Sequence, residues 1–361
     1  MNQNNNNSAA VIIDPLPAHR IDSGALARWL QREVPDAGNG LTVRQFQGGM
    51  SNPTYLLTTS DGTRYVLRKK PPGDLLPKAH AIDREFRVMG ALQNTDVPVP
   101  EMVAYCDDPG VIGAEFYVMK HVEGRIIPAD DMGSVTAEER TPLSRSLIST
   151  LGSLHRVDWR QAGLESFGRP EGYLGRQTSR WSSQYEAAKS SLPADFDYSE
   201  MDWLRDWLMD HSQVPDESAI VHGDYRIGNA IVHPEKPVVI SVLDWELSTI
   251  GHPLADLAYL CLHYHLPGEL GGTADRPQPG LPTEQEALAW YCEQTGRKGI
   301  PDWPVFLAFA FFRGAAIAQG VAARAARGNV STASMDPAVA GNRARQLAKA
   351  GANIARSLAG A

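Results

Sequence analysis

Three oxygen-bearing side chains near the middle of the chain could bind a divalent cation and assist phosphoryl transfer. Asp224 and Asn229 lie in a polar loop after the apolar run 220–221, and Asp244 ends a second apolar run, 238–243. Apolar runs bounded by turn residues are typical of buried strands, which would hold these side chains on rigid supports. Hard cations such as Mg²⁺ prefer carboxylate and amide oxygens and share their coordination shell with nucleotide phosphates. The pattern therefore predicts the catalytic loop and metal site of a phosphoryl-transfer enzyme.

The same spacing has an ordinary explanation when it occurs alone. An Asp and an Asn separated by four residues are common by chance, and such loops often form simple turns. Here the loop His222-Gly-Asp224-x-x-x-x-Asn229 lies between two apolar runs and is followed by Leu243-Asp244-Trp-Glu246. This combination resembles the aminoglycoside phosphotransferase and choline kinase superfamily, which shares the protein-kinase-like fold.

The resemblance extends from about residue 43 to residue 327. The segment 250–258, Ile-Gly-His-Pro-Leu-Ala-Asp-Leu-Ala, is similar to the family segment after the metal-binding Asp, although His252 stands where Asp is common. Further residues resemble the subgroup whose kinase-like domain is fused to acyl-CoA dehydrogenases in animals. These are Arg176, Gln177, Arg180, Trp181 and Gln184, and then Arg313, Gln319, Gly320 and Arg324.

The resemblance implies roles for the residues of the loop. Asp224 would orient the acceptor hydroxyl and take its proton, while Asn229 and Asp244 would hold Mg²⁺ on the phosphates of ATP. Positioning and charge neutralisation dominate phosphoryl transfer, so Asp224 need not be a strong base. Asp256 is expected to brace the loop, and His222 is expected to be structural rather than catalytic.

A glycine loop is the candidate phosphate-binding segment. Gly48, Gly49, Ser51 and Asn52 lie between two predicted strands, where glycine lets the backbone approach phosphate oxygens and Ser51 adds a donor. A plain hairpin turn is the alternative. The chain contains neither a G-x-x-x-x-G-K-[ST] nor a G-x-G-x-x-G motif, which removes the main support for a P-loop kinase or a dinucleotide-binding enzyme.

The strand that follows carries a candidate phosphate-binding cation. In this superfamily Arg often replaces the phosphate-binding Lys of protein kinases, and Arg68 occupies that strand. Glu85 on the next predicted helix is the expected ion-pair partner of Arg68, with an exposed helix charge as the alternative. Lys69 would point to the other face of the strand and be solvated. The adenine is expected on backbone groups near the junction of the lobes, at Met119, His121 and Val122.

The element pattern predicts an α+β, bilobal, protein-kinase-like fold. The length of 361 residues suits two lobes. We expect a disordered tail over residues 1–18, an antiparallel small lobe with one inserted helix over 19–122, and a helical lobe over 123–361. Expected strands of the small lobe are 41–46, 54–59, 64–69, 103–106 and 116–119, with a helix at 80–92. The other expected helices are 23–34, before the strands of the small lobe, and 141–155, 173–192, 201–211, 253–265, 283–295, 303–327 and 336–358 in the helical lobe.

Composition excludes several classes of protein. A net charge of −8 argues against nucleic acid as the partner, because phosphate backbones favour basic surfaces. The most apolar stretch, 305–323, is interrupted by Arg313 and Gln319 and makes a poor membrane span. Three scattered cysteines fit a reducing compartment, and residues 1–10 lack the features of a signal peptide. We therefore expect a cytoplasmic protein whose partner is a small molecule; the oligomeric state is left open.

The charge distribution bears on the acceptor. Residues 305–361 carry seven basic residues and one acid, a charge of +6, which leaves −14 for the rest of the chain. Arg313 and Arg324 fall on one helical face with small residues between them, and such a face suits a carboxylate, a phosphate or a CoA-like acceptor. Pairing with acids of the same lobe is the alternative. Glu246 is a further candidate near the substrate or a second metal.

These observations predict an ATP- and Mg²⁺-dependent phosphotransferase acting on a hydroxyl of a small molecule. An anionic hydroxyacyl compound or hydroxy acid is the favoured acceptor. An aminoglycoside or choline-like kinase is one alternative, and a catalytically inactive nucleotide-binding module that regulates a partner is another.

Overall fold

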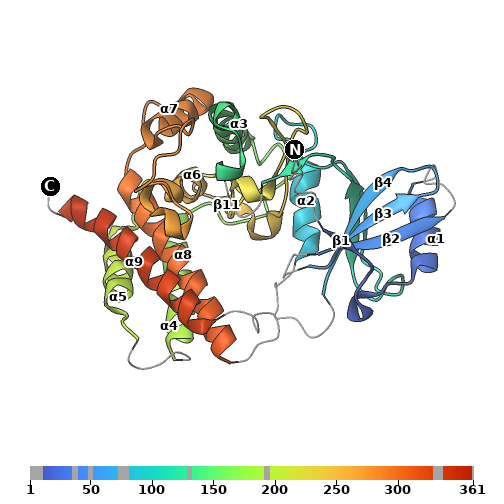
Figure 1. The fold of residues 1–361 in the computed structure, drawn as a ribbon, viewed down its shortest axis with the longest axis horizontal. Helices are drawn as coiled ribbons and strands as arrows, with labels where there is room; N and C mark the ends of the chain where they lie inside the picture. Colours follow the sequence, from blue (N-terminus) through green and yellow to red (C-terminus); the bar gives the residue numbers. More distant parts are fainter. Residues whose placement is uncertain are drawn as a thin grey trace, which may run out of the picture. The chain divides into compact units, whose positions relative to one another are not determined.

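The computed structural model describes residues 11–34, 40–47, 52–71, 81–127, 132–190, 196–327 and 336–359. The chain divides into two compact units. Unit 1 comprises Met1–Ser134, Arg160–Leu164 and Ile227–Ser248, and unit 2 comprises Val135–Trp159, Glu165–Arg226 and Thr249–Ala361. The segment 227–248, which contains two of the predicted metal ligands, therefore packs with the N-terminal part of the chain. Figure 1 follows the chain from blue to red.

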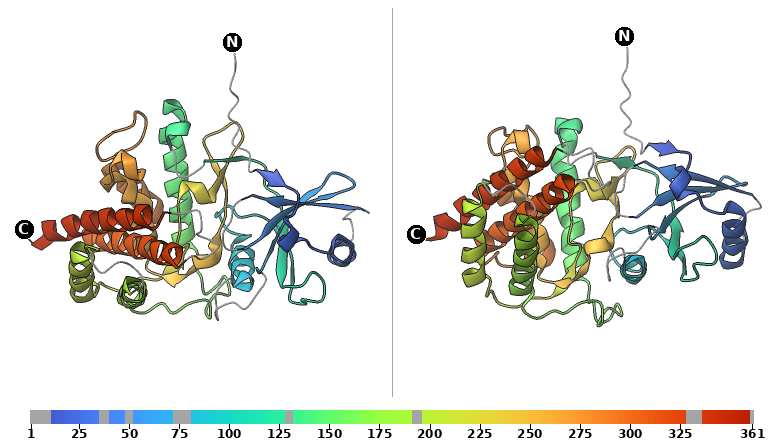
Figure 2. Two further views of the ribbon diagram at one scale, coloured as in Figure 1. Left: turned by 60° about the horizontal axis from the view of Figure 1, so that its bottom comes forward. Right: turned by 90° about the horizontal axis from the view of Figure 1, so that it is seen from below.

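Unit 1 is built on a six-stranded antiparallel sheet in the order β1-β2-β3-β4-β6-β5. Two helices, α1 (Ser23–Glu33) and α2 (Ile82–Leu92), pack on it and lie on opposite sides (Figures 1 and 2). Side chains alternate between the two faces of a strand, so each strand contributes to both layers. The strands are β1 (Ile12–Ile13), β2 (Leu41–Phe46), β3 (Thr54–Thr59), β4 (Arg64–Lys69), β5 (Met102–Cys106) and β6 (Phe116–Lys120).

A core beneath α1 holds this sheet together. Leu26, Trp29 and Leu30 of α1 are buried against the inward side chains of the strands, and Trp29 makes an edge-on contact with Phe116 at 4.7 Å between ring centroids. The β3–β4 hairpin turns at Gly62, whose φ of +87° suits the Asp-Gly turn that the sequence predicts. A second, three-stranded sheet in unit 1 has the order β10-β9-β7, with β7 (Arg125–Ile126), β9 (Ala230–Val232) and β10 (Val239–Val242).

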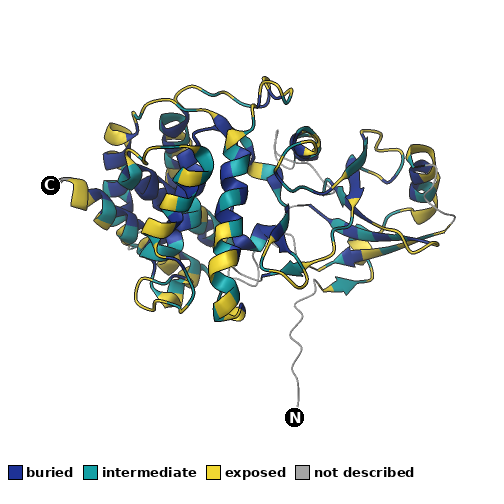
Figure 3. Cartoon of the chain, turned by 90° about the horizontal axis from the view of Figure 1, so that it is seen from above, coloured by how far each residue is buried: buried dark blue, intermediate teal, exposed yellow. Residues whose placement is uncertain are grey.

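Unit 2 is mainly helical and is organised around α8 (Trp303–Ala326), which packs against α4, α5, α6 and α9. Helix α8 is long and apolar enough to cross a membrane, with a mean hydropathy of 1.7. However, 78% of its most apolar stretch of 18 residues is buried inside the protein. Figure 3 colours the described residues by how far each is buried. The other elements are α3 (Ala137–Arg156), α4 (Tyr173–Lys189), β8 (Ala219–Val221), α5 (Ser199–His211), β11 (Thr249–Gly251), α6 (Pro253–Cys261), α7 (Glu284–Thr295) and α9 (Pro337–Ala359).

The structure differs from the sequence expectation at the start of the chain. Residues 11–18 belong to the predicted disordered tail, yet β1 pairs with the edge of β2 and a short 3₁₀ helix follows at Pro17–His19. The backbone N–H of Leu16 donates to Gln45 at 3.0 Å, and the Tyr55 hydroxyl donates to the carbonyl of His19 at 2.7 Å. The two prolines discourage a helix or a central strand but are compatible with an edge strand and a 3₁₀ turn. Residues 1–10 lie outside the described residues.

Candidate functional site

Unit 1 places one guanidinium among three carboxylates. Arg68 projects from β4, and its Nε lies 3.2 Å from Glu85 Oε2 on α2, which is the ion pair that the sequence predicts. Its Nη2 donates to Asp244 Oδ1 at 2.8 Å and lies 3.6 Å from Glu246 Oε2. Three carboxylates around one guanidinium leave this cluster with an excess of negative charge.

Glu85 is the buried member of the cluster and is fully shielded from solvent. Its carboxylate accepts hydrogen bonds from Asn52 Nδ2 at 3.1 Å and from the Tyr117 hydroxyl at 2.9 Å. Burial raises the pKa of Glu85 from 4.5 to about 7, against the opposing effect of Arg68. Burial lowers the pKa of Arg68, but Glu85 and the other nearby charges that favour the cation outweigh it and leave this pKa above its ordinary value.

Asp244 is held at the end of β10 in an uncommon backbone conformation. Its φ of +66° lies in the left-handed region, which Asp tolerates better than most residues. The next residue, Trp245, is buried, and its Nε1 donates to the carbonyl of Val242 at 3.0 Å. The backbone N–H of Leu243 donates to the carbonyl of Asn229 at 2.8 Å, next to the β9–β10 pairing. Asn229 and the residue before Asp244 are thus joined through their backbones.

This arrangement fits the chemistry of a magnesium site. Within the described residues, no group of three or more His, Cys, Asp and Glu side chains is placed to hold a metal ion. The donor set would instead be the Asp244 carboxylate and the Asn229 amide oxygen. Mg²⁺ is usually bound by one or two protein carboxylates together with substrate phosphates and water, so two protein ligands beside an anionic cluster are compatible with it.

Unit 2 contains the loop with Asp224, which begins after β8. Gly223 has φ of +84°, a conformation that requires glycine. The buried carboxylate of Asp256, at the start of α6, accepts from the backbone N–H of His222 at 2.5 Å and of Gly223 at 2.9 Å. Burial raises the pKa of Asp256, but the nearby imidazoles of His155 and His222 and the hydrogen bond from the backbone N–H of Gly223 outweigh it and hold this pKa below its ordinary value. Asp256 therefore braces the loop as a charged carboxylate.

Asp224 itself is surrounded by polar partners within the same unit. Its backbone N–H donates to His222 Nδ1 at 3.2 Å, and Arg226 Nε lies 3.4 Å from Asp224 Oδ2. The Tyr259 side chain on α6 is hydrogen-bonded to Asp224, and burial, followed by the charge of Asp224, raises the pKa of that phenol. The loop is thus fixed on both sides of the carboxylate.

Arg313 of α8 supports the loop from below. Its guanidinium donates to the carbonyl of Gly223 and lies over the rings of Trp181, at 5.6 Å, and Tyr259, at 5.2 Å. Stacking on two aromatic rings while bonding to a carbonyl uses the planar, fork-shaped geometry of arginine. Arg313 therefore links α4, α6 and α8 to the backbone beside Asp224.

Comparison with known proteins identifies the family. Residues 42–291 match the profile of the phosphotransferase enzyme family known as APH. The chain belongs to this family. A solved Ralstonia eutropha protein, provisionally described as an aminoglycoside phosphotransferase, is 39% identical, with a TM-score of 0.82 over 94% of this chain and 99% of that one. The choline kinase of Cryptosporidium parvum is 15% identical, with a TM-score of 0.62 over 90% of this chain and 97% of that one, and it shares the fold.

Curated relatives carry this phosphotransferase segment within longer chains. Acyl-CoA dehydrogenase family member 11 of Rattus norvegicus is 43% identical over 95% of this chain but only 44% of its own length. The probable acyl-CoA dehydrogenase IBR3 of Arabidopsis thaliana is 40% identical over 91% of this chain and 41% of its own length. The chain thus spans less than half of these relatives. The predicted resemblance and the α+β kinase-like fold are confirmed.

The structure of this phosphotransferase corrects one placement. Lys69, expected to be solvated, is buried, and its Nζ donates to the carbonyl of Ile112 at 3.4 Å. Arg313 is only 6% exposed and is engaged by the loop backbone and two rings, and its contact with an anionic acceptor stays a prediction. Arg324, near the end of α8, is exposed to solvent.

The remaining predicted ligands of the nucleotide lie in unit 1. Asn52 is buried and contacts Glu85, while Gly48, Gly49 and Ser51 lie outside the described residues. Met119 is in β6, and the backbone N–H of His121 donates to the carbonyl of Arg64 at 3.1 Å. Val122 follows in an irregular segment. The assignment of adenine to this segment stays a prediction.

Sequence reasoning missed three residues that shape the site. Tyr259 lies one helical turn after Asp256, so it could have been placed on the same face of α6 as that brace. His155 contacts Asp256 at 3.6 Å from a helix about a hundred residues earlier, and nothing local in the sequence signals it. Tyr117 lies in β6, and the alternation of side chains along this strand places it on the face of the sheet that α2 covers. From there its hydroxyl donates to Glu85.

Proposed function

We propose that this phosphotransferase transfers the γ-phosphate of ATP, in the presence of Mg²⁺, to a hydroxyl of a small anionic acyl compound or hydroxy acid. The proposal is carried by the residues that each unit, taken by itself, holds in place. One unit holds Arg68 and Asp244 beside the buried Glu85, and the other holds Asp224 on a braced loop. A protein that only bound nucleotide would not need the braced loop that carries Asp224.

The residues of this chain divide the work of the reaction. Arg68 would bind phosphate oxygens, with Glu85 fixing its orientation. Asn229 and Asp244 would hold Mg²⁺, which neutralises charge on the transferring phosphoryl group when bound. Asp224 would accept the proton of the acceptor hydroxyl. At the same time the oxygen of that hydroxyl would bond to the γ-phosphorus, and the bond between the γ-phosphorus and the bridging oxygen would break to release ADP. The transition state is loose, so orientation by the braced loop contributes more than basicity.

The acceptor class is supported by two observations. The curated relatives that carry this segment are named as acyl-CoA dehydrogenases, which favours an acyl compound. The +6 charge of residues 305–361 favours an anion, and Arg324 is the exposed member of the predicted arginine pair. Glu246, beside Arg68, is kept as a candidate contact of the substrate or of a second cation.

An aminoglycoside kinase is the second candidate, because the Ralstonia eutropha structure carries that provisional description. The two candidates differ in the charge of the acceptor. Aminoglycosides are polycations and would be disfavoured by a basic acceptor surface.

The test is a phosphorylation screen with radiolabelled ATP and Mg²⁺ against hydroxy acids, hydroxyacyl-CoA thioesters, aminoglycosides and choline. We expect turnover of an anionic hydroxyl compound and a loss of at least about a hundredfold in kcat on Asp224→Asn, within the usual range for a proton acceptor. Asp210→Asn, an exposed acid on α5, is the matched control. Full activity of Asp224→Asn would refute the assignment, and turnover of aminoglycosides alone would replace the acceptor.

A further inference from the structure

Helix α2 carries two arginines that contact backbone carbonyls. Arg84 Nη2 donates to the carbonyl of Ser248 at 3.2 Å, and Arg87 Nη2 donates to the carbonyl of Gly163 at 2.8 Å. Residues three apart are neighbours on the surface of a helix, so the two arginines leave α2 side by side. Both acceptors lie in segments that belong to unit 1 but come from much later in the chain. The two guanidinium groups therefore tie α2 to these segments.

Ser248 ends a short turn that begins at Asp244. Asp244 precedes the 3₁₀ helix Trp245–Leu247, and the backbone N–H of Ser248 donates to the carbonyl of Trp245 at 3.0 Å. Ser248 is only 3% exposed, and α2 packs directly on this 3₁₀ helix. Arg84 thus fixes one end of a single helical turn, and the predicted metal ligand Asp244 stands at the other end.

The end of this turn at Asp244 is also connected to α2. Glu85, next to Arg84 in the sequence, pairs with Arg68 Nε at 3.2 Å. Arg68 Nη2 in turn donates to Asp244 Oδ1 at 2.8 Å. Helix α2 therefore reaches the turn at both of its ends, through Arg68 at the carboxylate and through Arg84 at the last carbonyl.

The two contacts differ in what a bound nucleotide would do to them. In the proposed function Arg68 binds phosphate oxygens and Asp244 holds Mg²⁺, so both partners of that ion pair take up new ligands. The contact between Arg84 and the Ser248 carbonyl includes neither of these groups and can stay in place. It is therefore the contact that would keep the turn fixed on α2 while the nucleotide is bound.

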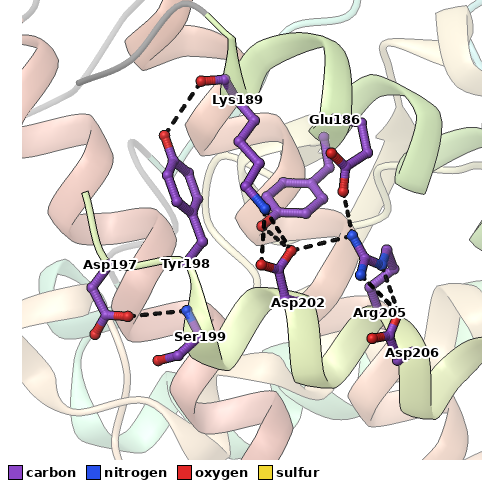
Figure 4. A network of polar contacts seen from close by, with 9 residues as sticks. Glu186, Lys189, Asp197, Tyr198, Ser199, Asp202, Arg205 and Asp206 are labelled. Carbon is purple, nitrogen blue, oxygen red and sulfur yellow. Dashed lines mark hydrogen bonds and ion pairs between the residues drawn. The ribbon is translucent and has the colours of Figure 1, made fainter. Parts of the chain in front are cut away.

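The acceptor of Arg84 is a backbone atom, unlike the acceptors in the ion-pair network that joins α4 to α5. There Lys189 donates to both carboxylate oxygens of Asp202, at 2.9 and 2.8 Å. Arg205 pairs with Asp202 and Asp206 in the same network (Figure 4). Such pairs must hold two flexible side chains in one geometry. A bond to a carbonyl instead fixes the backbone of the acceptor, here directly at the end of the turn.

We propose that Arg84 is a positioning residue for phosphotransfer, which through the carbonyl of Ser248 keeps the Asp244 carboxylate where it can bind Mg²⁺ together with ATP. This inference rests on the proposed function. Arg84 acts through the backbone rather than on a ligand, so its effect belongs in the dependence of ATP binding on Mg²⁺.

Arg84→Met tests the proposal, because it keeps an unbranched side chain and removes the donor. Isothermal titration calorimetry on the full chain gives the Kd of ATP with excess Mg²⁺ and with EDTA. We expect Arg84→Met to weaken ATP binding about tenfold with Mg²⁺, the effect of one hydrogen bond, and to leave binding in EDTA unchanged. Arg84→Lys keeps a donor and should recover most of the loss. Arg87→Met removes the same kind of contact from the same helix and should change neither Kd.

Three outcomes overturn the proposal. They are an unchanged Mg²⁺ dependence in Arg84→Met, the same loss in Arg87→Met, and an equal loss with Mg²⁺ and with EDTA, which a merely structural arginine would give. Arg205→Met breaks the network of Figure 4 and should lower the melting temperature without changing the Mg²⁺ dependence. A changed dependence in that variant would mean that lost stability explains the effect, which also contradicts the proposal.

Two provisions keep the test decisive. If Arg84→Met does not fold, Arg84→Gln gives the same comparison, because its polar side chain is shorter by two bonds and leaves the carbonyl out of reach. If the wild type itself binds ATP without any dependence on Mg²⁺, the proposed function fails. If the wild type shows the dependence and the Arg84 variants share it, only the positioning role fails.

Discussion

Replacing Glu85 by glutamine tests whether burial or the ion pair with Arg68 governs this carboxylate. Because the pKa of Glu85 is raised from 4.5 to about 7, the group is protonated in the folded state at pH values where the unfolded chain has already lost the proton. Its contribution to stability is therefore fully present below pH 4.5 and is lost as the pH rises through about 7. The amide variant cannot ionise and should escape this loss.

The size of the effect follows from the pKa difference. Each pKa unit corresponds to about 1.4 kcal/mol, so a rise from 4.5 to about 7 is worth about 3 kcal/mol in the free energy of unfolding. No discount for solvent screening is needed, because Glu85 is fully buried. We expect Glu85→Gln to differ little from the wild type near pH 4.5 and to be more stable than the wild type by about 3 kcal/mol at pH 8.

The measurement must report on unit 1 alone, since the two units need not unfold together. Urea denaturation followed by pulsed hydrogen exchange, read in peptides from β4 and β6, isolates this unit. Glu101→Gln is the matched control, because Glu101 is an exposed residue of unit 1 whose ion pair with Lys120 lies on the surface. A difference between variant and wild type that stays constant with pH, or a variant that is less stable than the wild type at pH 8, would refute the reasoning. The second outcome would mean that Arg68 depresses the pKa of Glu85.

Two further predictions concern unit 2. Tyr259→Phe removes the hydrogen bond to Asp224. We expect steady-state kinetics to show a kcat about tenfold lower and an unchanged KM for ATP. A rise of about tenfold in the KM for ATP would instead indicate a general disturbance of the protein. His252 is 4% exposed, and burial lowers its pKa from 6.5 to about 4. The unfolded chain therefore takes up a proton at a higher pH than the folded protein does. The contribution of His252 to stability is present above pH 6.5 and is lost as the pH falls towards 4. His252→Asn keeps a side-chain acceptor for the backbone N–H of Leu254 and should remove about 3 kcal/mol of this acid sensitivity, read by hydrogen exchange in peptides from α6.

Local patterns were sufficient to predict most of unit 1. The strands β2, β3 and β4 begin and end at the predicted residues, because alternating side chains and the Asp-Gly turn at Gly62 fix both the register and the hairpin. The Arg68–Glu85 pair was predicted from the resemblance to the family, because the sequence pattern alone was equally compatible with Glu85 as an exposed helix charge. The strand bounds, in contrast, depend on periodicity and on short-range order.

Burial on two faces of a sheet was not predictable from the same patterns. Lys69 alternates away from Arg68, and a strand with only one covered face would leave it in water. Helices pack on both sides of this sheet, so Lys69 is enclosed and burial lowers the pKa of its ammonium group. Sequence alternation identifies which residues share a face and does not tell whether that face is covered.

The two arginines of α8 show why helical periodicity is a weak guide to an acceptor site. Arg313 and Arg324 share a face in the sequence, but Arg313 lies where α4 and α6 cross α8, and it is buried beneath the loop by Trp181 and Tyr259. Its guanidinium donates to the carbonyl of Gly223 and so fixes the backbone beside Asp224. Helical periodicity places the two arginines on one face and does not tell which of them is left exposed to an acceptor.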